Sequence, residues 1–181
     1  MLRTMIIATQ HPDLKITQLV EGDALEHFAV IERNRDHLAP WLPWVPLVNS
    51  AKDVARFIAV SQAAWLGRHE FACALRLNGS IVGGIGIVDA DHENECVSLG
   101  YWLDHEVCGR GFMTMAVRAL TQWCFSDLKR HRVQIRAARH NVASRAIPER
   151  LGFMEEGLLR QVAIVAGVRQ DMVLYARLRT D

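Results

Sequence analysis

Near the middle of the chain runs Tyr101-Trp102-Leu103-Asp104-His105-Glu106-Val107-Cys108-Gly109-Arg110-Gly111-Phe112-Met113-Thr114. An apolar strand here leads into a Gly-x-Gly turn, and a helix begins directly after the turn. That helix lacks a Ser, Asp or Asn cap where one is expected, so its first amides are free for an outside acceptor. Glycines let the backbone approach that acceptor, and the helix dipole together with Arg110 favours an anion. The segment predicts a pyrophosphate cradle; the alternative is a turn that only joins strand and helix.

The turn differs from two common nucleotide-binding motifs. No Gly-Lys-Ser/Thr follows it, so it is not a P-loop. Thr114 stands where the dinucleotide-binding fingerprint has its third glycine, which makes the Rossmann match poor. A phosphate bound here would therefore belong to another class of ligand.

On either side of this segment, hydrophobic periodicity predicts one α/β (α+β) domain over residues 1–181, built around a single sheet. Asn78-Gly79 is a strong hairpin signal, and Pro40, Pro43 and Pro46 exclude a regular helix in the Pro-Trp-Leu-Pro-Trp region. The predicted strands cover 14–20, 71–77, 81–88, 96–103, 132–137, 153–165 and 169–178. The predicted helices cover 23–33, 50–66, 112–126 and 141–151.

The composition limits the class of protein. Half of the residues are hydrophobic and 23% are charged, which is typical of a globular chain, and the formal net charge of +1 gives no footprint for nucleic acid. No apolar run approaches the roughly 20 residues of a membrane span, and the start does not resemble a signal peptide. We therefore expect a cytoplasmic protein with no membrane partner. The cysteines form no C-x-x-C pair and no H-E-x-x-H is present, so we expect no metal site.

A second segment of interest is Asn141-Val142-Ala143-Ser144, which is followed by Leu151-Gly152-Phe153. Asn141 is a good helix cap and Ser144 lies on the first turn of the helix. Taken alone, the two residues could be an ordinary capping pair. They follow the glycine turn by about 30 residues, with a strand between, and that order is informative.

Together these segments resemble the GNAT superfamily of N-acetyltransferases, and more closely its RimJ/RimL branch of ribosomal-protein N-acetyltransferases. Each motif alone is weak, but the ordered set is specific and covers nearly the whole chain. The motifs are the early Trp-Leu-Pro-Trp loop, Gly100-Tyr101-Trp102-Leu103, Gly109-Arg110-Gly111, Asn141-x-x-Ser144, Leu151-Gly152-Phe153, Glu156-Gly157 and Asp171-x-x-x-Tyr175.

The resemblance implies direct transfer of acetyl from acetyl-CoA to an amine, with no metal. It implies a mixed, mostly antiparallel sheet that splays between its fourth and fifth strands, where the thioester would lie. Ser144 would be the catalytic acid beside the sulfur, Asn141 would contact the pantetheine arm, and the backbone near Leu103 would hold that arm. The remaining cofactor-binding residues would be Cys108, Gly109, Arg110, Gly111, Phe112, Met113 and Thr114.

The acceptor is less well defined. Trp41 and Trp44 on the proline-rich loop are candidate substrate-binding residues, and the alternative is that they anchor the loop on the core. The leading expectation is the α-amino group of a protein N-terminus. A small amine (an antibiotic, toxin, polyamine or amino sugar) and a non-catalytic CoA-binding protein are the alternatives. The resemblance also allows a homodimer.

Four features depart from the family pattern. Met113 replaces the usual small residue, so its bulk could reduce the room for the phosphate. Cys108 replaces the usual Gln or Arg, and a thiol near a helix N-terminus beside Arg110 is expected to have a lowered pKa; the alternative is a tolerated substitution. Pro148 cannot donate to the carbonyl of Ser144, so we expect a kink. Ala163 stands where some ribosomal enzymes have a Glu base. The candidates for that role are Glu95, Ser98, Asp89 and His140, with a water chain as the alternative.

Overall fold

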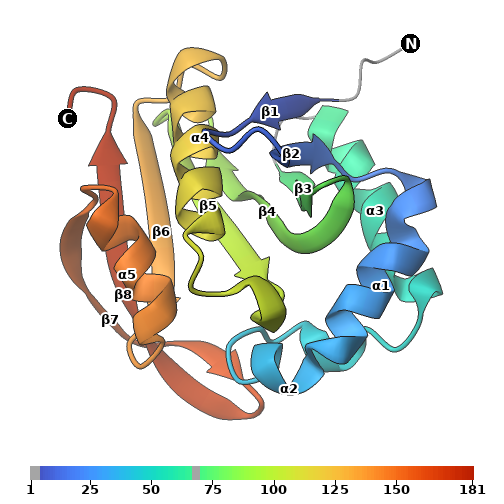
Figure 1. Ribbon diagram of the computed structural model, residues 1–181. Helices are drawn as coiled ribbons and strands as arrows, with labels where there is room; N and C mark the ends of the chain where they lie inside the picture. Colours follow the sequence, from blue (N-terminus) through green and yellow to red (C-terminus); the bar gives the residue numbers. More distant parts are fainter. Residues whose placement is uncertain (1–4, 67–69) are drawn as a thin grey trace.

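An eight-stranded sheet organises the molecule, a computed structural model in which residues 5–66 and 70–181 are described (Figure 1). The strand order is β1-β2-β3-β4-β5-β6-β8-β7, and every neighbouring pair is antiparallel except β5 and β6, which run parallel. The strands are β1 Ile6–Ala8, β2 Leu14–Gln18, β3 Phe71–Leu77, β4 Ser80–Asp91, β5 Cys96–Leu103, β6 Arg132–Ala138, β7 Met154–Val165 and β8 Val168–Leu178.

Helices cover both faces of the sheet. One face carries α4 and α5, and the other carries α1 and α3, which pack together (Figure 1). The helices are α1 Ala24–Arg33, α2 Arg35–Leu38, α3 Ala51–Leu66, α4 Phe112–Ser126 and α5 Val142–Arg150, with short 3-10 turns at Glu21–Asp23, Val45–Leu47 and His105–Val107.

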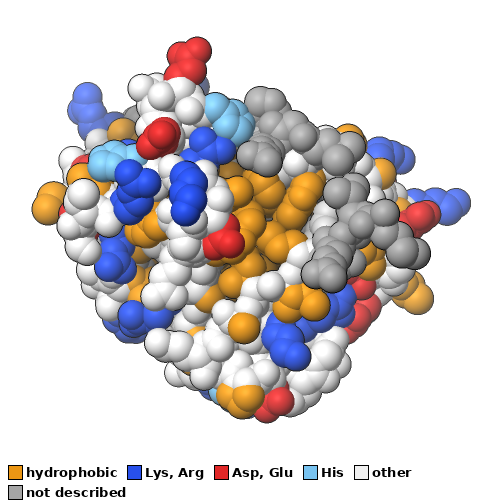
Figure 2. All heavy atoms as spheres, turned by 90° about the horizontal axis from the view of Figure 1, so that it is seen from above, with side chains coloured by type: hydrophobic (Ala, Val, Ile, Leu, Met, Phe, Trp, Pro, Cys, Tyr) orange, Lys and Arg blue, Asp and Glu red, His pale blue; other side chains and the backbone are white. Residues whose placement is uncertain are grey.

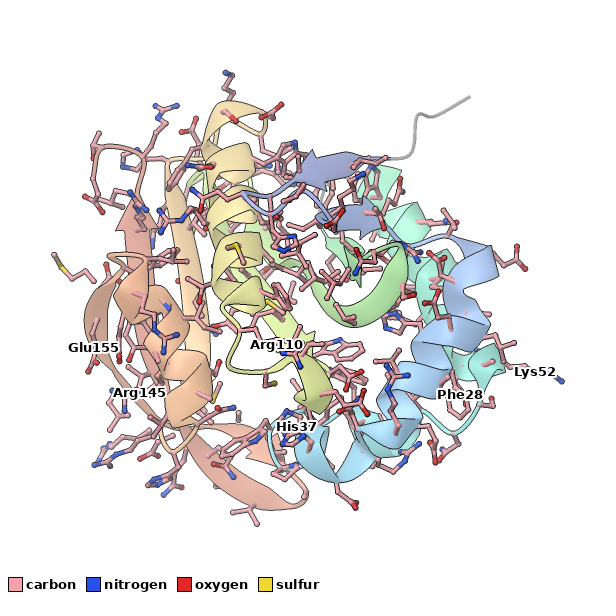
Figure 3. All side chains as sticks on the ribbon, viewed as in Figure 1. Phe28, His37, Lys52, Arg110, Arg145 and Glu155 are labelled. Atoms are coloured by element: carbon pink, nitrogen blue, oxygen red, sulfur yellow. The ribbon has the colours of Figure 1, made fainter. Side chains whose placement is uncertain are left out.

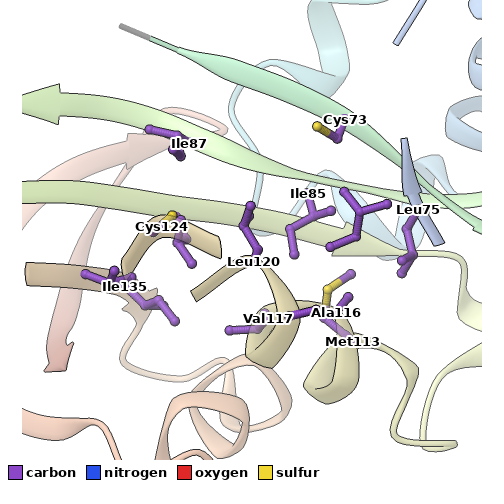
Figure 4. Close-up of a cluster of buried hydrophobic side chains, with 14 of the residues drawn as sticks. Cys73, Leu75, Ile85, Ile87, Met113, Ala116, Val117, Leu120, Cys124 and Ile135 are labelled. Atoms are coloured by element: carbon purple, nitrogen blue, oxygen red, sulfur yellow. The ribbon is translucent and has the colours of Figure 1, made fainter. Parts of the chain in front are cut away.

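The α4 helix forms the centre of the larger core. Its buried residues recur at three- and four-residue steps and face alternate positions of the strands beneath, as the periodicity predicts (Figure 4). The side chains labelled there include Met113, Ala116, Val117, Leu120 and Cys124 from the helix and Cys73, Leu75, Ile85, Ile87 and Ile135 from the sheet. A second core lies under α1 and α3 and includes Val30, Val54, Ile58, Ala74 and Ile81.

The sheet opens between β5 and β6. Their parallel register runs from Cys96 opposite Arg132 to Leu99 opposite Ile135 and then stops, although both strands continue. The ends of the two strands, Gly100–Leu103 and Arg136–Ala138, are thus unpaired with each other. This is the predicted splay between the fourth and fifth predicted strands, and the prediction is confirmed.

Most predicted elements match the structure to within three residues at each end. The Asn78-Gly79 hairpin is present, with φ values of 52° and 88° that suit a tight turn. Two elements were missed: β1, of three residues, and α2, of four residues, which lies where the charge pattern predicts an exposed polar stretch near the acceptor. Both are too short for a periodic pattern to identify.

Candidate active site

A cleft of about 860 Å³ occupies the opening between β5 and β6. The walls come from the β5 and β6 ends, the start of α4, one side of α5, α2 and the proline-rich loop. Successive side chains of a strand point to opposite faces of the sheet. The cleft is lined by side chains of both faces, so it passes through the sheet. Tyr101 and Leu103 pack with the α4 core, whereas Trp102 packs with the α1 core. On β6, Ile135 faces α4, so Arg136 next to it faces the opposite side.

The turn before α4 leaves its backbone donors free. Gly111 is the N-cap residue with φ 79°, Gly109 has φ 77°, and no side chain caps the helix. Among the described residues, none accepts a hydrogen bond from the amides of residues 109–114, whereas the Cys108 amide bonds the His105 carbonyl. Apart from the adjacent residues, nothing in the described part of the chain lies within 4 Å of where a Cβ on either glycine would be. Free amides at a helix N-terminus beside open space form an anion site.

The residues flanking these amides differ from the sequence-based expectations in detail. The Arg110 guanidinium donates to the Glu106 carbonyl at 3.2 Å and is exposed, so it lies at the edge of the turn and is not one of the cleft-lining side chains. Met113, noted for its size, buries its side chain in the core and is 5% exposed. The bulk of Met113 therefore does not fill the space in front of the amides. Phe112 packs edge-on against His11, and Thr114 lines the cleft.

The end of β5 presents backbone groups to the cleft. Asp104 donates its amide to the Val82 carbonyl of β4 at 2.8 Å. Because amides along a strand point alternately to its two edges, the Leu103 amide points to the edge that faces β6. No β6 residue pairs with it there. An extended ligand arm could add to this open edge as another strand would.

Ser144 reaches the cleft from the first turn of α5. The Asn141 side chain caps the helix by accepting from the Ser144 amide at 3.1 Å, and both residues line the cleft. The Ser144 hydroxyl lies 3.4 Å from the Tyr101 hydroxyl. The structure thus brings Ser144, Asn141, Leu103 and the free amides into one cavity.

Tyr101 is a cleft residue whose apolar ring and place in a strand predict a core or sheet position. It does pack there, but its hydroxyl reaches across the opening to α5. Burial raises the pKa of Tyr101 to about 12, with the Ser144 hydrogen bond acting in the opposite direction, so the phenol stays protonated near neutral pH. The available signal was its place two residues before the end of a strand at the predicted splay.

A buried carboxylate fixes the turn to α1. Asp104 is 2% exposed and accepts hydrogen bonds from Arg33 and from Asn34 at 3.0 Å, while the Asn34 oxygen accepts from the His105 amide at 2.9 Å. Burial alone would raise the pKa of Asp104, but the hydrogen bonds from Arg33, Asn34 and the Glu106 amide hold it below its usual value. The turn before α4 is therefore tied to the end of α1 by hydrogen bonds. No local sequence pattern indicates this network, because its partners lie far apart in the chain.

The expectation of a lowered pKa for the Cys108 thiol is wrong. Burial and the neighbouring Asp104 carboxylate raise its pKa, and the thiol lies 3.4 Å from the Asp104 carbonyl. Cys108 is exposed and lines the cleft, but the α4 helix begins at Phe112, beyond the first-turn range over which a helix dipole acts. The tolerated-substitution alternative therefore fits better.

The opposite side of the cleft is built from scattered side chains. Trp41 lines it, whereas Trp44 packs against Trp102 with ring centroids 6.2 Å apart and is not among its lining residues, so Trp44 fits the anchoring alternative. Arg136 also lines it, and the Arg136 guanidinium makes no hydrogen bond or ion pair with the residues that the structure describes. The rest of this side consists of His37, Leu38, Leu42 and Met172.

None of the four candidate bases lines the cleft. Ser98 is buried and accepts from Gln134 at 2.9 Å, and the others are exposed elsewhere: Asp89, Glu95 and His140. His37 of α2 does line it, and burial together with the nearby His105 ring, 5.1 Å away, lowers the pKa of His37 (Figure 3). It is therefore uncharged at neutral pH and can accept a proton.

An anion cradle, a strand edge and a hydroxyl on one side of a cavity, with a separate aromatic and basic side opposite, suit an enzyme that joins two substrates. Residues 13–154 match the acetyltransferase (GNAT) domain family. The chain belongs to this family and is an acetyltransferase of the N-acetyltransferase class.

Similar proteins agree with this assignment. The chain is 33% identical over 166 residues to "Putative ribosomal N-acetyltransferase YdaF" of Bacillus subtilis (strain 168), covering 91% of each protein. RimL, a ribosomal L7/L12 α-N-protein acetyltransferase solved with coenzyme A, superposes with TM-score 0.92 at 22% identity, over 96% of this chain and 98% of that one. The microcin C7 self-immunity acetyltransferase MccE, solved with acetyl-CoA and AMP, gives TM-score 0.89 at 25% identity, over 93% of both chains.

The described residues, 5–66 and 70–181, lack two further features. They contain no group of three or more His, Cys, Asp or Glu side chains that could hold a metal ion. No helix among them is long and apolar enough to cross a membrane. On the face seen in Figure 2, basic side chains lie at several separate places around a hydrophobic area, not in a single stripe. The absence of a nucleic-acid partner stays a prediction.

Proposed function

We propose that this protein transfers the acetyl group of acetyl-CoA to the α-amino group of a protein N-terminus. The observation that carries the proposal is the cleft through the sheet, with the free amides of residues 109–114 and the Ser144 hydroxyl on one side and an open acceptor side opposite. The relatives named for ribosomal-protein acetylation support this acceptor class. We also propose a cytoplasmic location, because those relatives are named for ribosomal substrates; the homodimer stays a prediction.

The chain's own groups divide the work. The amides of residues 109–114 hold the pyrophosphate, and the open edge of β5 at Leu103 holds the pantetheine arm and polarises the thioester carbonyl. Acetyl-CoA supplies the activated acetyl group. As the amine nitrogen bonds to the carbonyl carbon and the carbon–sulfur bond breaks, the Ser144 hydroxyl donates a hydrogen bond or proton to the leaving sulfur. Holding both reactants in one cavity supplies most of the acceleration.

The amine must lose a proton during this reaction, and His37 is the best-placed acceptor. Two other titratable groups in the cleft, Cys108 and Tyr101, have raised pKa values and stay protonated near neutral pH. The guanidinium groups that line the cleft offer no acceptor for the proton. His37 has a lowered pKa, lies on the acceptor side and is uncharged. The groups around it are His105 and the Asp104 carboxylate, which Arg33 pairs.

The test is a thiol-release assay with acetyl-CoA and matched acceptors. With peptides that have a free N-terminus, acetyl-CoA should release the CoA thiol and the peptide should gain one acetyl group at that terminus. The same peptides with a blocked N-terminus should give neither result. Ser144→Ala should lower kcat by about 100-fold while leaving the KM for acetyl-CoA within about twofold. Transfer to small amines alone would support the small-amine alternative. CoA-dependent thermal stabilisation without thiol release from any amine would indicate a CoA-binding protein without catalysis.

A further inference from the structure

Pro148 lies inside α5 and removes one helical hydrogen bond. In a regular helix the amide of a residue bonds the carbonyl four positions earlier, so residue 148 would serve the carbonyl of Ser144. Proline has no amide hydrogen, and that carbonyl needs another donor. Pro148 is buried, and its ring occupies the part of the helix from which an amide would have donated. The residue whose carbonyl is freed is the proposed acid.

The Tyr101 hydroxyl takes the place of the missing amide. It donates to the Ser144 carbonyl at 3.1 Å, so a bond that α5 would have made within itself is made to β5 across the opening of the sheet. A phenol has one hydrogen, and the carbonyl can only accept. The Tyr101 oxygen is therefore left as the acceptor for the Ser144 hydroxyl, 3.4 Å away. That second contact is long and therefore weak, which leaves the Ser144 hydrogen available to a better acceptor in the cleft.

The other side of α5 is held by a different tyrosine. Tyr175 of β8 is fully buried, accepts from Arg145 at 2.8 Å and donates to Glu149 at 2.8 Å. Arg145 also lies 3.5 Å from Glu155 of β7 (Figure 3). The two tyrosines of the chain thus both bind α5, but only Tyr101 bonds Ser144 itself.

We propose that Pro148 and Tyr101 are positioning residues that set the place of Ser144 in the cleft. Pro148 withholds the amide that would bind the Ser144 carbonyl in a regular helix, and the Tyr101 hydroxyl binds that carbonyl and fixes the first turn of α5 against β5. The Ser144 hydroxyl is thereby held at the cleft wall with only a weak partner of its own. This inference rests on the proposed function, because it assigns Ser144 its task.

A double-mutant cycle tests the shared bond. Tyr101→Phe removes the hydroxyl and keeps the ring, and Pro148→Ala restores an amide that competes for the Ser144 carbonyl. We expect Tyr101→Phe to lower kcat about tenfold and Pro148→Ala a few-fold, with the KM for acetyl-CoA within about twofold in each. The double variant should have the same kcat as Tyr101→Phe alone, because both changes disrupt the same hydrogen bond, that between the Tyr101 hydroxyl and the Ser144 carbonyl. Additive effects, as for independent sites, would overturn the proposal.

Tyr175→Phe is the matched control. It also removes one hydroxyl bonded to α5, so a general loosening of the helix would affect it in the same way. We expect its effect on kcat to add to that of Pro148→Ala, in contrast to Tyr101→Phe. If both tyrosine variants combine with Pro148→Ala alike, the role of Tyr101 is no more than holding the helix, and the proposal is wrong.

A binding measurement separates this inference from the proposed function. Calorimetry with CoA and desulfo-CoA reports contacts at the sulfur without any turnover. Wild type and Tyr175→Phe should bind CoA more tightly than desulfo-CoA. Most of that preference should be lost in three variants: Ser144→Ala, Tyr101→Phe and Pro148→Ala. Loss in Ser144→Ala with full preference in Tyr101→Phe would overturn the inference and leave the proposed function intact. A wild type with neither preference nor transfer would overturn the proposed function.

Discussion

The two sides of the cleft are built by different means. The side assigned to acetyl-CoA consists largely of backbone: free amides after Gly109, the open edge at Leu103, and one hydroxyl at a helix start. The acceptor side consists of side chains from α2, the proline-rich loop, β6 and β8, including Trp41 and Arg136. Backbone geometry tolerates many sequences, whereas side chains define what binds. The first side therefore suits an unchanging donor, and the second suits an acceptor that differs among relatives.

Asp104 ties the turn before α4 to the end of α1, directly before α2, so its loss should have the largest effect. Asp104→Asn removes the charge that Arg33 and Asn34 bind, at the point where α1 meets the phosphate turn. We expect a loss of about 2 kcal/mol in the free energy of unfolding, below the range for a fully buried pair because the Arg33 side chain is 47% exposed and can be solvated. The KM values for acetyl-CoA and for the acceptor should both rise, as steady-state kinetics would report.

The pH dependence of this variant sharpens the test. The folded-state pKa of Asp104 is lowered, so its contribution is present above the unfolded pKa of about 3.9 and is lost as pH falls through the folded value. The stability difference between wild type and Asp104→Asn in urea titrations should therefore narrow below about pH 4. Asp23→Asn is the control, because Asp23 pairs with Arg76 at 2.6 Å elsewhere. It should destabilise the fold without raising either KM; equal KM changes would deny Asp104 its linking role.

Gly111→Val should affect only the side of the cleft assigned to acetyl-CoA. A branched residue at φ 79° is strained by about 1–2 kcal/mol, and its side chain would enter the open space before the amides. We expect the KM for acetyl-CoA to rise about 20-fold with little change in the acceptor KM. Gly79→Val imposes similar strain at φ 88° in the hairpin, also in open space. If that control raises the acetyl-CoA KM equally, the effect is loss of fold and not of the cradle.

Features of the site that depend on a short stretch of chain could be predicted from the sequence, and contacts between distant residues could not. The uncapped turn, the Asn141 cap and the strand ends are local signals, and the sheet opening followed from their order through the family resemblance. The Tyr101–Ser144 contact and the Asp104–Arg33 pair join residues 43 and 71 positions apart. No local pattern encodes such pairs, because their side chains meet only after the strands and helices have packed. Arg136 was missed as a cleft residue for the same reason, whereas His37 belongs to an exposed polar stretch whose charge pattern predicts a place near the acceptor.

Trp41→Ala should affect the acceptor side alone. Trp41 lines the cleft, so its truncation removes apolar surface that an acceptor would cover, and the acceptor KM should rise about tenfold. The KM for acetyl-CoA should stay within about twofold. Trp44→Ala is the matched comparison, since Trp44 packs on Trp102 and the second core. It should lower the melting temperature and leave the acceptor KM nearly unchanged. If Trp44→Ala raises the acceptor KM and Trp41→Ala only lowers the melting temperature, Trp44 contacts the acceptor and Trp41 anchors the loop.

Arg136→Met should give the smallest change, and one that depends on the acceptor. Arg136 has an unpaired guanidinium on the acceptor side among the described residues, so an acidic residue near the acceptor amine would gain from it. We expect kcat/KM for acidic N-terminal peptides to fall about threefold at low salt, with a smaller fall at high salt and none for neutral peptides, because an exposed charge pair is weak and screened. Arg132→Met is the control: Arg132 lies on the same strand face but is already paired with Glu156. A fall that is equal for acidic and neutral peptides would mean that Arg136 shapes the cleft wall and does not select charge, and the acceptor side would then discriminate by apolar contact alone.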